Sequence, residues 1–370
     1  MADIFDYIDW RGDLSFENVP PAEPDYLIFS ALSYVEMNGL YTPEEEEGIT
    51  VRQLYERYEA AGYAQAWMHF EPKRILAKAA ESERFGNVRV CRYREKNDEA
   101  TSMQFAAMTF IPRSGLYCVA FRGTDDSFTG WREDFYIACM DRVQAQQEAV
   151  RYLEDIAGSG GETLVLCGHS KGGHLAMYAD MHAEDPVRSR VKALYVFDSP
   201  GFRRETAEGE RILQTGEKTF RYLPDTSVVG LLMFDPVAYI TVASKAAAGS
   251  THNPYNWQVM GSHLVREEKL TAVSEYLDTV LDQWLDAVPD EERLRFINML
   301  FDAVDASGVA FGDLEKNPLK AYPAILSALN DIDPQMKEEA LDIIGRLANA
   351  GKEVLIGNVT EAIRERFKNS

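Results

Sequence analysis

The segment 164–178 carries the residues whose types and spacing are best suited to chemistry. It reads Leu-Val-Leu-Cys-Gly-His-Ser-Lys-Gly-Gly-His-Leu-Ala-Met-Tyr and contains the pattern G-x-S-x-G. An apolar run with strand character, 164–167, precedes the turn, and a helix-type sequence, 174–182, follows it. Strand, tight turn and helix in this order form a nucleophile elbow, and both glycines are expected because a Cβ there would crowd the turn. The sequence therefore predicts Ser170 as a nucleophile.

A nucleophilic serine needs two backbone donors for the oxyanion that forms in acyl transfer. The N–H of Lys171, directly after the nucleophile at the start of the helix, is the first expected donor. The second is expected from a loop that follows an earlier strand. An apolar strand ends in Phe-Arg-Gly-Thr, where Gly123 permits a turn and Thr124 offers its N–H and hydroxyl. We therefore predict Lys171 and Thr124 as the oxyanion residues.

The general base is expected to be a histidine within hydrogen-bond reach of Ser170. His252 and His263 follow the last predicted strand, where the chain order Ser, Asp, His places the base. His252 lies in a loop, Ser-Thr-His-Asn-Pro-Tyr-Asn-Trp, whereas His263 is closer to the next helix, which it would cap or pack against. His169 adjoins the nucleophile in the turn and is expected to point elsewhere. The sequence thus favours His252.

Two aspartates are candidates for the carboxylate that orients the base. Asp198 directly ends an apolar strand, 191–197, and precedes Ser-Pro-Gly, a turn that would leave its side chain at the carboxyl end of the sheet. Asp225 follows the next strand, 219–223, and occupies the more usual topological position for the acid. Either aspartate could instead cap a turn or lie in a loop. Local context favours Asp198 and topology favours Asp225, so both remain candidates.

The elements that must position these residues alternate between strands and helices. This alternation indicates an α/β fold with a mostly parallel central sheet covered by helices. Pro112-Arg-Ser-Gly115 suits a hairpin between two of the strands. The predicted strands are 88–93, 103–111, 116–121, 164–167, 191–197, 219–223 and 237–243, and the predicted helices are 25–37, 51–63 and 144–156.

The pattern changes at Arg266, where apolar residues begin to repeat at helical spacing. Pro289-Asp290 interrupts this pattern, a second amphipathic helix runs to Val304, and Asp333-Pro334 starts another. We therefore predict two parts, an α/β-hydrolase domain with an N-terminal helical segment over 1–265 and an α-helical extension over 266–370. Because no Gly/Ser-rich or Pro-rich linker separates them, the extension is expected to pack on the first part.

The composition limits the classes of partner. The chain has 370 residues, 46% of them hydrophobic, and a formal net charge of −22, so it can bury a large core while its surface repels nucleic acid and anionic membranes. The N-terminus lacks the pattern of a secretory signal, and no run approaches the roughly 18 apolar residues of a membrane span. We expect a cytoplasmic protein with no integral membrane segment; the sequence identifies no protein partner. The cysteines are irregularly spaced and fit reduced, mostly buried thiols: Cys91, Cys118, Cys139 and Cys167.

Several motifs together carry a resemblance to known families. The chain resembles the class 3 (triacylglycerol) lipases and, more closely, a bacterial family of lipase-like α/β-hydrolases known mainly as a domain of unknown function. The resemblance spans about residues 1–265. Its motifs are Trp10-Arg-Gly-Asp-Leu-Ser-Phe16, Phe121-Arg-Gly-Thr124, Gly130-Trp-Arg-Glu-Asp134, Gly168-His-Ser-Lys-Gly-Gly173, Phe197-Asp-Ser-Pro-Gly-Phe202, Pro224-Asp-Thr-Ser-Val-Val-Gly230 and His252-Asn-Pro-Tyr-Asn-Trp257.

The resemblance implies an α/β-hydrolase fold with Ser170 as nucleophile, His252 as base and Thr124 as an oxyanion residue. The class 3 lipases take their acid from the later loop, which points to Asp225, whereas the D-x-P-G-F pattern of the closer family fits Asp198. Most of the helical extension departs from the class 3 pattern.

These residues predict a serine hydrolase that cleaves carboxylic esters, with lipid esters or other small acyl esters as substrates. A Ser-His-Asp triad needs neither a metal nor a cofactor. Two other functions also fit. The same triad serves thioesterases and peptidases, and the fold could instead be a non-catalytic scaffold that binds a partner.

Overall fold

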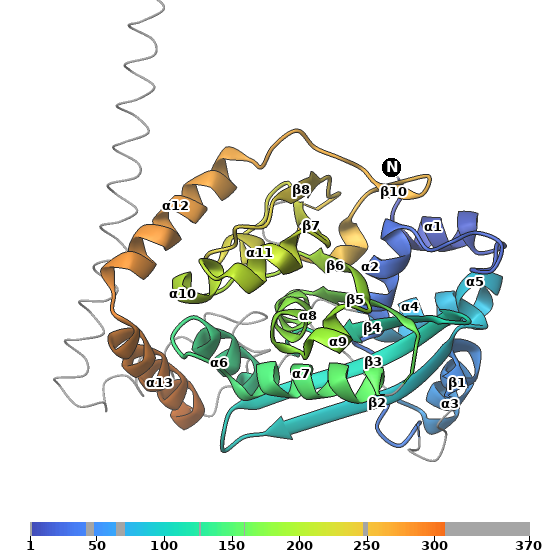
Figure 1. Cartoon of the computed structure of the whole chain (residues 1–370), viewed down its shortest axis with the longest axis horizontal. Coiled ribbons are helices and arrows are strands. Elements are labelled where there is room, and N and C mark those ends of the chain that lie inside the picture. Colours follow the sequence, from blue (N-terminus) through green and yellow to red (C-terminus); the bar gives the residue numbers. More distant parts are fainter. Residues whose placement is uncertain are drawn as a thin grey trace, which may run out of the picture.

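An eight-stranded sheet forms the centre of the protein (Figure 1), with the strands in chain order from β1 to β8. The first four strands pair antiparallel, and β4 to β8 pair parallel. The computed structural model describes residues 2–41, 48–63, 71–125, 127–158, 160–246 and 251–307. In α/β folds of this kind, side chains with functions collect where the parallel strands end.

The strands of the central sheet are β1 (Ile49–Thr50), β2 (Arg89–Asp98), β3 (Met103–Arg113), β4 (Leu116–Phe121), β5 (Thr163–His169), β6 (Val191–Phe197), β7 (Thr219–Pro224) and β8 (Tyr239–Val242). A small antiparallel pair consists of β9 (Val259–Met260) and β10 (His263–Leu264). The helices before the elbow strand are α1 (Ile4–Arg11), α2 (Glu23–Leu32), α3 (Val51–Ala61), α4 (Pro72–Glu81), α5 (Glu83–Gly86), α6 (Phe128–Ile137) and α7 (Gln144–Ala157). Those after it are α8 (Lys171–His182), α9 (Asp185–Arg188), α10 (Arg204–Ala207), α11 (Glu210–Gly216), α12 (Ala272–Ala287) and α13 (Asp290–Ser307), with short 3-10 turns η1 (Val229–Leu231) and η2 (Pro254–Asn256).

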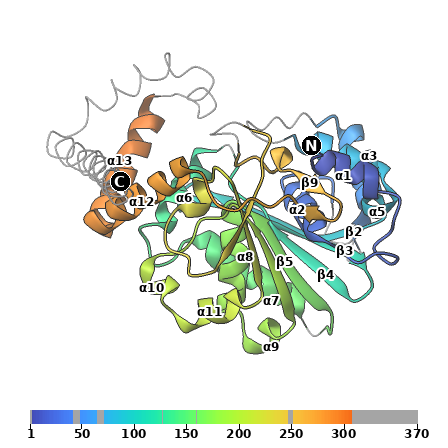
Figure 2. The same cartoon turned by 90° about the horizontal axis from the view of Figure 1, so that it is seen from above.

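Helices cover both faces of the sheet, which explains why its central strands are largely apolar (Figure 2). Successive side chains of a strand point to opposite faces. In β4, Cys118 and Ala120 join the apolar cluster of the N-terminal helices, whereas Val119 and Phe121 join the cluster of α7 and α8. Each central strand therefore contributes to two hydrophobic cores, one on each face.

The α/β fold predicted from the sequence is confirmed, and the predicted strands are all present. The hairpin between β3 and β4 is also present, with Gly115 at φ +74°. The predicted helices at 25 and 51 are α2 and α3, which end earlier than expected. The sequence analysis missed α1, α4 and α6. The predicted helix that begins at Asp333 lies outside the described residues.

The extension begins with α12 and α13, two amphipathic helices separated at Pro289 as the sequence predicts. Helix α13 packs on α6, where the side chains of Cys139, Ile297 and Phe301 form a small buried cluster. No helix in the described part of the chain is long and apolar enough to cross a membrane. All four cysteines are buried and free, as expected for reduced thiols.

A buried ion pair joins the N-terminal segment to α5. Arg84 donates from Nε and Nη2 to the two carboxylate oxygens of Asp25 at 2.7 Å each, and from Nη1 to the carbonyl of Leu14 at 2.8 Å. Both charged side chains are fully buried. Removing one partner would leave the other charge buried without compensation, which is the costly way to break such a pair.

We therefore expect Arg84→Ala to lower the free energy of unfolding by about 3–5 kcal/mol, measured by urea denaturation. Lys73→Ala serves as the control, because its ion pair with Glu59 is largely exposed and should leave the midpoint unchanged. Equal midpoints for Arg84→Ala and the wild type would contradict the importance of this pair.

Candidate active site

Ser170 occupies a strained turn between β5 and α8. Its backbone has φ 58° and ψ −136°, a region that residues with a side chain rarely adopt. Its N–H donates to the carbonyl of Phe197 at 2.9 Å, and its side chain is half-buried. A serine held in this way projects its hydroxyl away from the sheet, as in a nucleophile elbow.

Two glycines allow the neighbouring strand to approach this turn closely. A Cβ on Gly172 would lie 2.1 Å from the carbonyl oxygen of Phe121, so the first turn of α8 packs directly on the end of β4. A Cβ on Gly123 would lie 2.7 Å from the carbonyl oxygen of His169 and 3.2 Å from Cβ of Ser170. The loop that follows β4, with Thr124, therefore runs directly beside the turn.

The structure brings His252 and Asp198 together. Nδ1 of His252 lies 2.7 Å from Oδ2 of Asp198. The other carboxylate oxygen, Oδ1, accepts hydrogen bonds from the hydroxyl of Ser227 at 2.6 Å and from the N–H of Gly230 at 3.0 Å. Because a carboxylate accepts hydrogen bonds, a neutral His252 ring in this contact carries its proton on Nδ1 and its lone pair on Nε2. This is the tautomer that a general base requires.

The other two candidates from the sequence bind other groups in the described part of the chain. Asp225 contributes its backbone, whose N–H donates to Val242 and whose carbonyl accepts from Thr271. His263 is exposed and lies 3.4 Å from Glu23, a contact with the N-terminal helices. The expected contact between Ser170 and His252 stays a prediction.

His169 supports the loop that carries His252, a role that the sequence analysis missed. Its Nε2 lies 2.7 Å from the carbonyl oxygen of His252, which can only accept, so Nε2 carries the proton. Its Nδ1 lies 3.1 Å from the hydroxyl of Tyr34, which donates to it. Burial holds the pKa of His169 well below its ordinary value, which keeps the ring neutral. His169 thus fixes the backbone of His252 through its side chain.

A buried network connects the two expected oxyanion residues. The ammonium of Lys171 donates to Oε2 of Glu133 at 3.1 Å and to Oε1 of Gln104 at 2.7 Å, and the side chains of Lys171 and Glu133 are each 1% exposed. The hydroxyl of Thr124 donates to Asp134, which follows Glu133 in α6. Burial raises the pKa of Asp134 to about 6, although Lys171 opposes the shift. Helix α6 therefore holds both residues through adjacent carboxylates.

His174 has a structural role beside the site. Its Nδ1 donates to the carbonyl of Gly201 at 2.8 Å, and its Nε2 accepts from Gln146 at 2.9 Å. Its ring also stacks on Phe202, with the centroids 4.3 Å apart. Burial lowers the pKa of His174 to about 4. The neutral ring of His174 thus stabilises the turn at Gly201, which follows Asp198 in the chain.

The residues that the sequence analysis missed contribute polar groups that hold the site in place: Tyr34, Gln104, Glu133, Asp134, His169, Ser227 and Gly230. Of these, Glu133, Asp134, His169, Ser227 and Gly230 lie inside motifs that carry the family resemblance, which is the one signal that could have found them.

Comparison with known proteins places the chain in a family. The model of the Mbeg1-like family matches residues 79–302, and the chain belongs to this family. Solved structures with a similar α/β fold include M37 lipase, with 16% identity over 56% of this chain and 69% of that chain and a TM-score of 0.36. A variant of MDLA from Penicillium cyclopium has 13% identity over 68% and 87% of the two chains, with a TM-score of 0.36. The triacylglyceride lipase of Rhizomucor miehei has 15% identity over 69% and 91%, with a TM-score of 0.35. No curated protein sequence matches the chain.

The low pKa of His174 makes stability depend on pH. The unfolded chain binds more protons than the folded chain between pH 6.5 and about 4, so stability is fully present above this window and is lost as the pH falls through it. From pH 7 to pH 5 this one histidine contributes a loss of about 2 kcal/mol. We expect the Tm of His174→Asn, which keeps a donor for Gly201 but does not titrate, to fall less steeply over this range than that of the wild type.

His263→Asn is the matched control, because the side chain of His263 is 69% exposed. Its Tm should follow the wild-type slope. Parallel slopes for His174→Asn and the wild type would show that His174 does not titrate as described.

Proposed function

We propose that this member of the Mbeg1-like family is a serine hydrolase that cleaves carboxylic esters. The observation that carries the proposal is the 2.7 Å hydrogen bond between His252 and Asp198, at the edge of the sheet where the strained turn of Ser170 begins α8. A buried carboxylate, a histidine in the base tautomer and a serine on a strained turn are the parts that acyl transfer requires.

In the proposed reaction the hydroxyl oxygen of Ser170 attacks the acyl carbon while Nε2 of His252 takes the hydroxyl proton. Asp198 stabilises the imidazolium that forms. The N–H groups of Lys171 and Thr124 donate to the oxyanion. His252 then gives the proton to the leaving alcohol, and water releases the acyl group by the reverse proton transfers. These steps use only the chain's own side chains and backbone.

The positive charge of Lys171 supports the same assignment. The buried ammonium belongs to the same residue whose backbone N–H would bind the oxyanion, and Glu133 balances its charge. Glu133 in turn accepts from the N–H groups of Gln104 at 3.0 Å and of Ala145 at 3.1 Å, so its position is fixed. Fixed charges and dipoles of this kind stabilise developing charge without reorganising during the reaction.

A fluorophosphonate probe tests the nucleophile directly, because it reacts with activated serines. We expect the full-length protein to be labelled on Ser170, with mass spectrometry of the tryptic peptide as the measurement. Ser170→Ala should lose labelling and the hydrolysis of p-nitrophenyl esters, and should keep the wild-type Tm. Absence of labelling in the folded wild type would favour a non-catalytic scaffold. Rates with esters of graded chain length, compared with rates for thioester and peptide substrates, would define the class of acyl substrate.

Substitutions of the two aspartates distinguish the proposed acid, Asp198, from the alternative, Asp225. Asp198→Asn preserves shape but disfavours the productive tautomer of His252, so kcat should fall on the order of 10⁴-fold. Asp225→Asn should keep most of the activity, since Asp225 contributes backbone hydrogen bonds that the substitution leaves in place. Both variants are assayed with the same ester, and the reverse ranking would identify Asp225 as the acid.

A further inference from the structure

Helix α6 lies between the candidate site and the C-terminal extension. On one side, Glu133 and Asp134 accept hydrogen bonds from Lys171 and Thr124. The helix begins directly after the loop of Thr124, with Ser127 as its N-cap. Any movement of α6 would therefore displace both proposed oxyanion residues.

Other side chains of α6 bind α13. Arg132 pairs with Asp302 at 2.8 Å, and the hydroxyl of Tyr136 donates to Oδ1 of Asn298 at 2.5 Å. The rings of Phe135 and Phe301 meet edge to face, with their centroids 5.7 Å apart. The α6 residues that make these contacts are adjacent in the chain to Glu133 and Asp134, whose carboxylates face the site.

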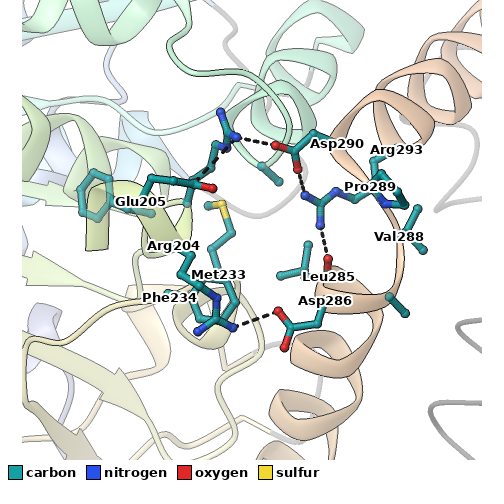
Figure 3. A pocket seen from close by; sticks show the side chains of 14 residues that line it. Arg204, Glu205, Met233, Phe234, Leu285, Asp286, Val288, Pro289, Asp290 and Arg293 are labelled. Atoms are coloured by element: carbon teal, nitrogen blue, oxygen red, sulfur yellow. Dashed lines mark hydrogen bonds and ion pairs between the residues drawn. The ribbon is translucent and has the colours of Figure 1, made fainter. Parts of the chain in front are cut away.

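The corner between α12 and α13 also binds the segment that follows Asp198. Arg204 pairs with Asp286 at 2.9 Å (Figure 3), and Arg203 pairs with Asp290. Arg293 of α13 donates to the carbonyl of Leu285 in α12 at 2.7 Å and so joins the two helices. A pocket of about 260 Å³ lies at this junction, beside these ion pairs.

Helix α6 has ten residues with a glycine among them, and a helix of this length is marginal without tertiary contacts. Its position must come from the elements packed against it. Helix α13 packs on one side of α6 through the buried side chains of Ile297 and Phe301, while Ile137 at the end of α6 packs into the core cluster of α7 and α8. Loss of α13 would uncover the side of α6 that carries Phe135 and leave α6 attached through Ile137 and its polar contacts with the site.

We propose that α13 is a positioning element of the hydrolase, in which Asn298, Phe301 and Asp302 hold α6 and thereby fix the oxyanion residues Thr124 and Lys171. The proposal rests on the proposed function and gives the C-terminal extension a role in it. None of these three residues touches the reacting atoms. Their loss should affect transition-state stabilisation and leave substrate binding and the His252–Asp198 pair intact.

The test uses the full-length variant Phe301→Ala, with Phe301→Leu as the matched control that keeps an apolar side chain against α6. For Phe301→Ala we expect kcat for p-nitrophenyl esters to fall at least tenfold, KM to stay within twofold and the pH profile to keep its midpoint. Hydrogen exchange measured by mass spectrometry should rise in the peptides covering 124–137 and stay unchanged in β5 and α8. Phe301→Leu should stay near the wild type in each measurement.

Tyr136→Phe provides a second variant that cannot collapse the interface, since it removes only the hydrogen bond to Asn298. It should lower kcat by a smaller factor, with a matching rise in exchange. Faster exchange in 124–137 with unchanged kcat would overturn the proposal, as would unchanged exchange in Phe301→Ala. If the wild type neither hydrolyses esters nor labels on Ser170, the proposed function fails separately, and exchange in 124–137 alone then decides whether α13 holds α6.

Discussion

The turn at Ser170 is the constraint on which the rest of the site depends. A side chain at φ 58° costs on the order of 1–3 kcal/mol and persists only where surrounding contacts impose it. Here the hydrogen bond from Ser170 to Phe197 and the packing of Gly172 on Phe121 hold the turn. The same hydrogen bond sets the register between β5 and β6, so Asp198, the residue after Phe197, comes to the same edge of the sheet.

Around this turn, the charged side chains lie in a few pairs of opposite charge. Burial lowers the pKa of both His169 and His174 and keeps the two rings neutral, and each ring nitrogen has a partner that fits one tautomer. The buried ammonium of Lys171 is balanced by Glu133. The remaining pair is His252 with Asp198, in which Nδ1 of the histidine faces the carboxylate. This arrangement leaves Nε2 as the ring nitrogen that the proposed reaction uses as the base.

The elbow, the parallel strands and the hairpin could be predicted from the sequence because their signals are local. Apolar runs, glycines and turn residues lie next to one another in the chain. The choice between Asp198 and Asp225 could not be made in this way, since both follow parallel strands. The proposal of Asp198 rests on three-dimensional features: its turn, with φ 44°, and the hydrogen bonds from Ser227 and Gly230 that orient its carboxylate. The network around Lys171 was missed because its partners lie 38 and 67 residues away.

Residues near both ends of the described chain support the candidate site. Tyr34 donates a hydrogen bond to His169, and Phe301 packs against α6. Protein chains emerge from the ribosome from the N-terminus, so Ser170, Asp198 and His252 are all made well before α13. Under the two proposals, a chain interrupted after residue 265 would carry every proposed reacting group and lack the helix that holds α6 in place. Such a copy would be a poor hydrolase, because synthesis of the triad residues alone would not complete the site.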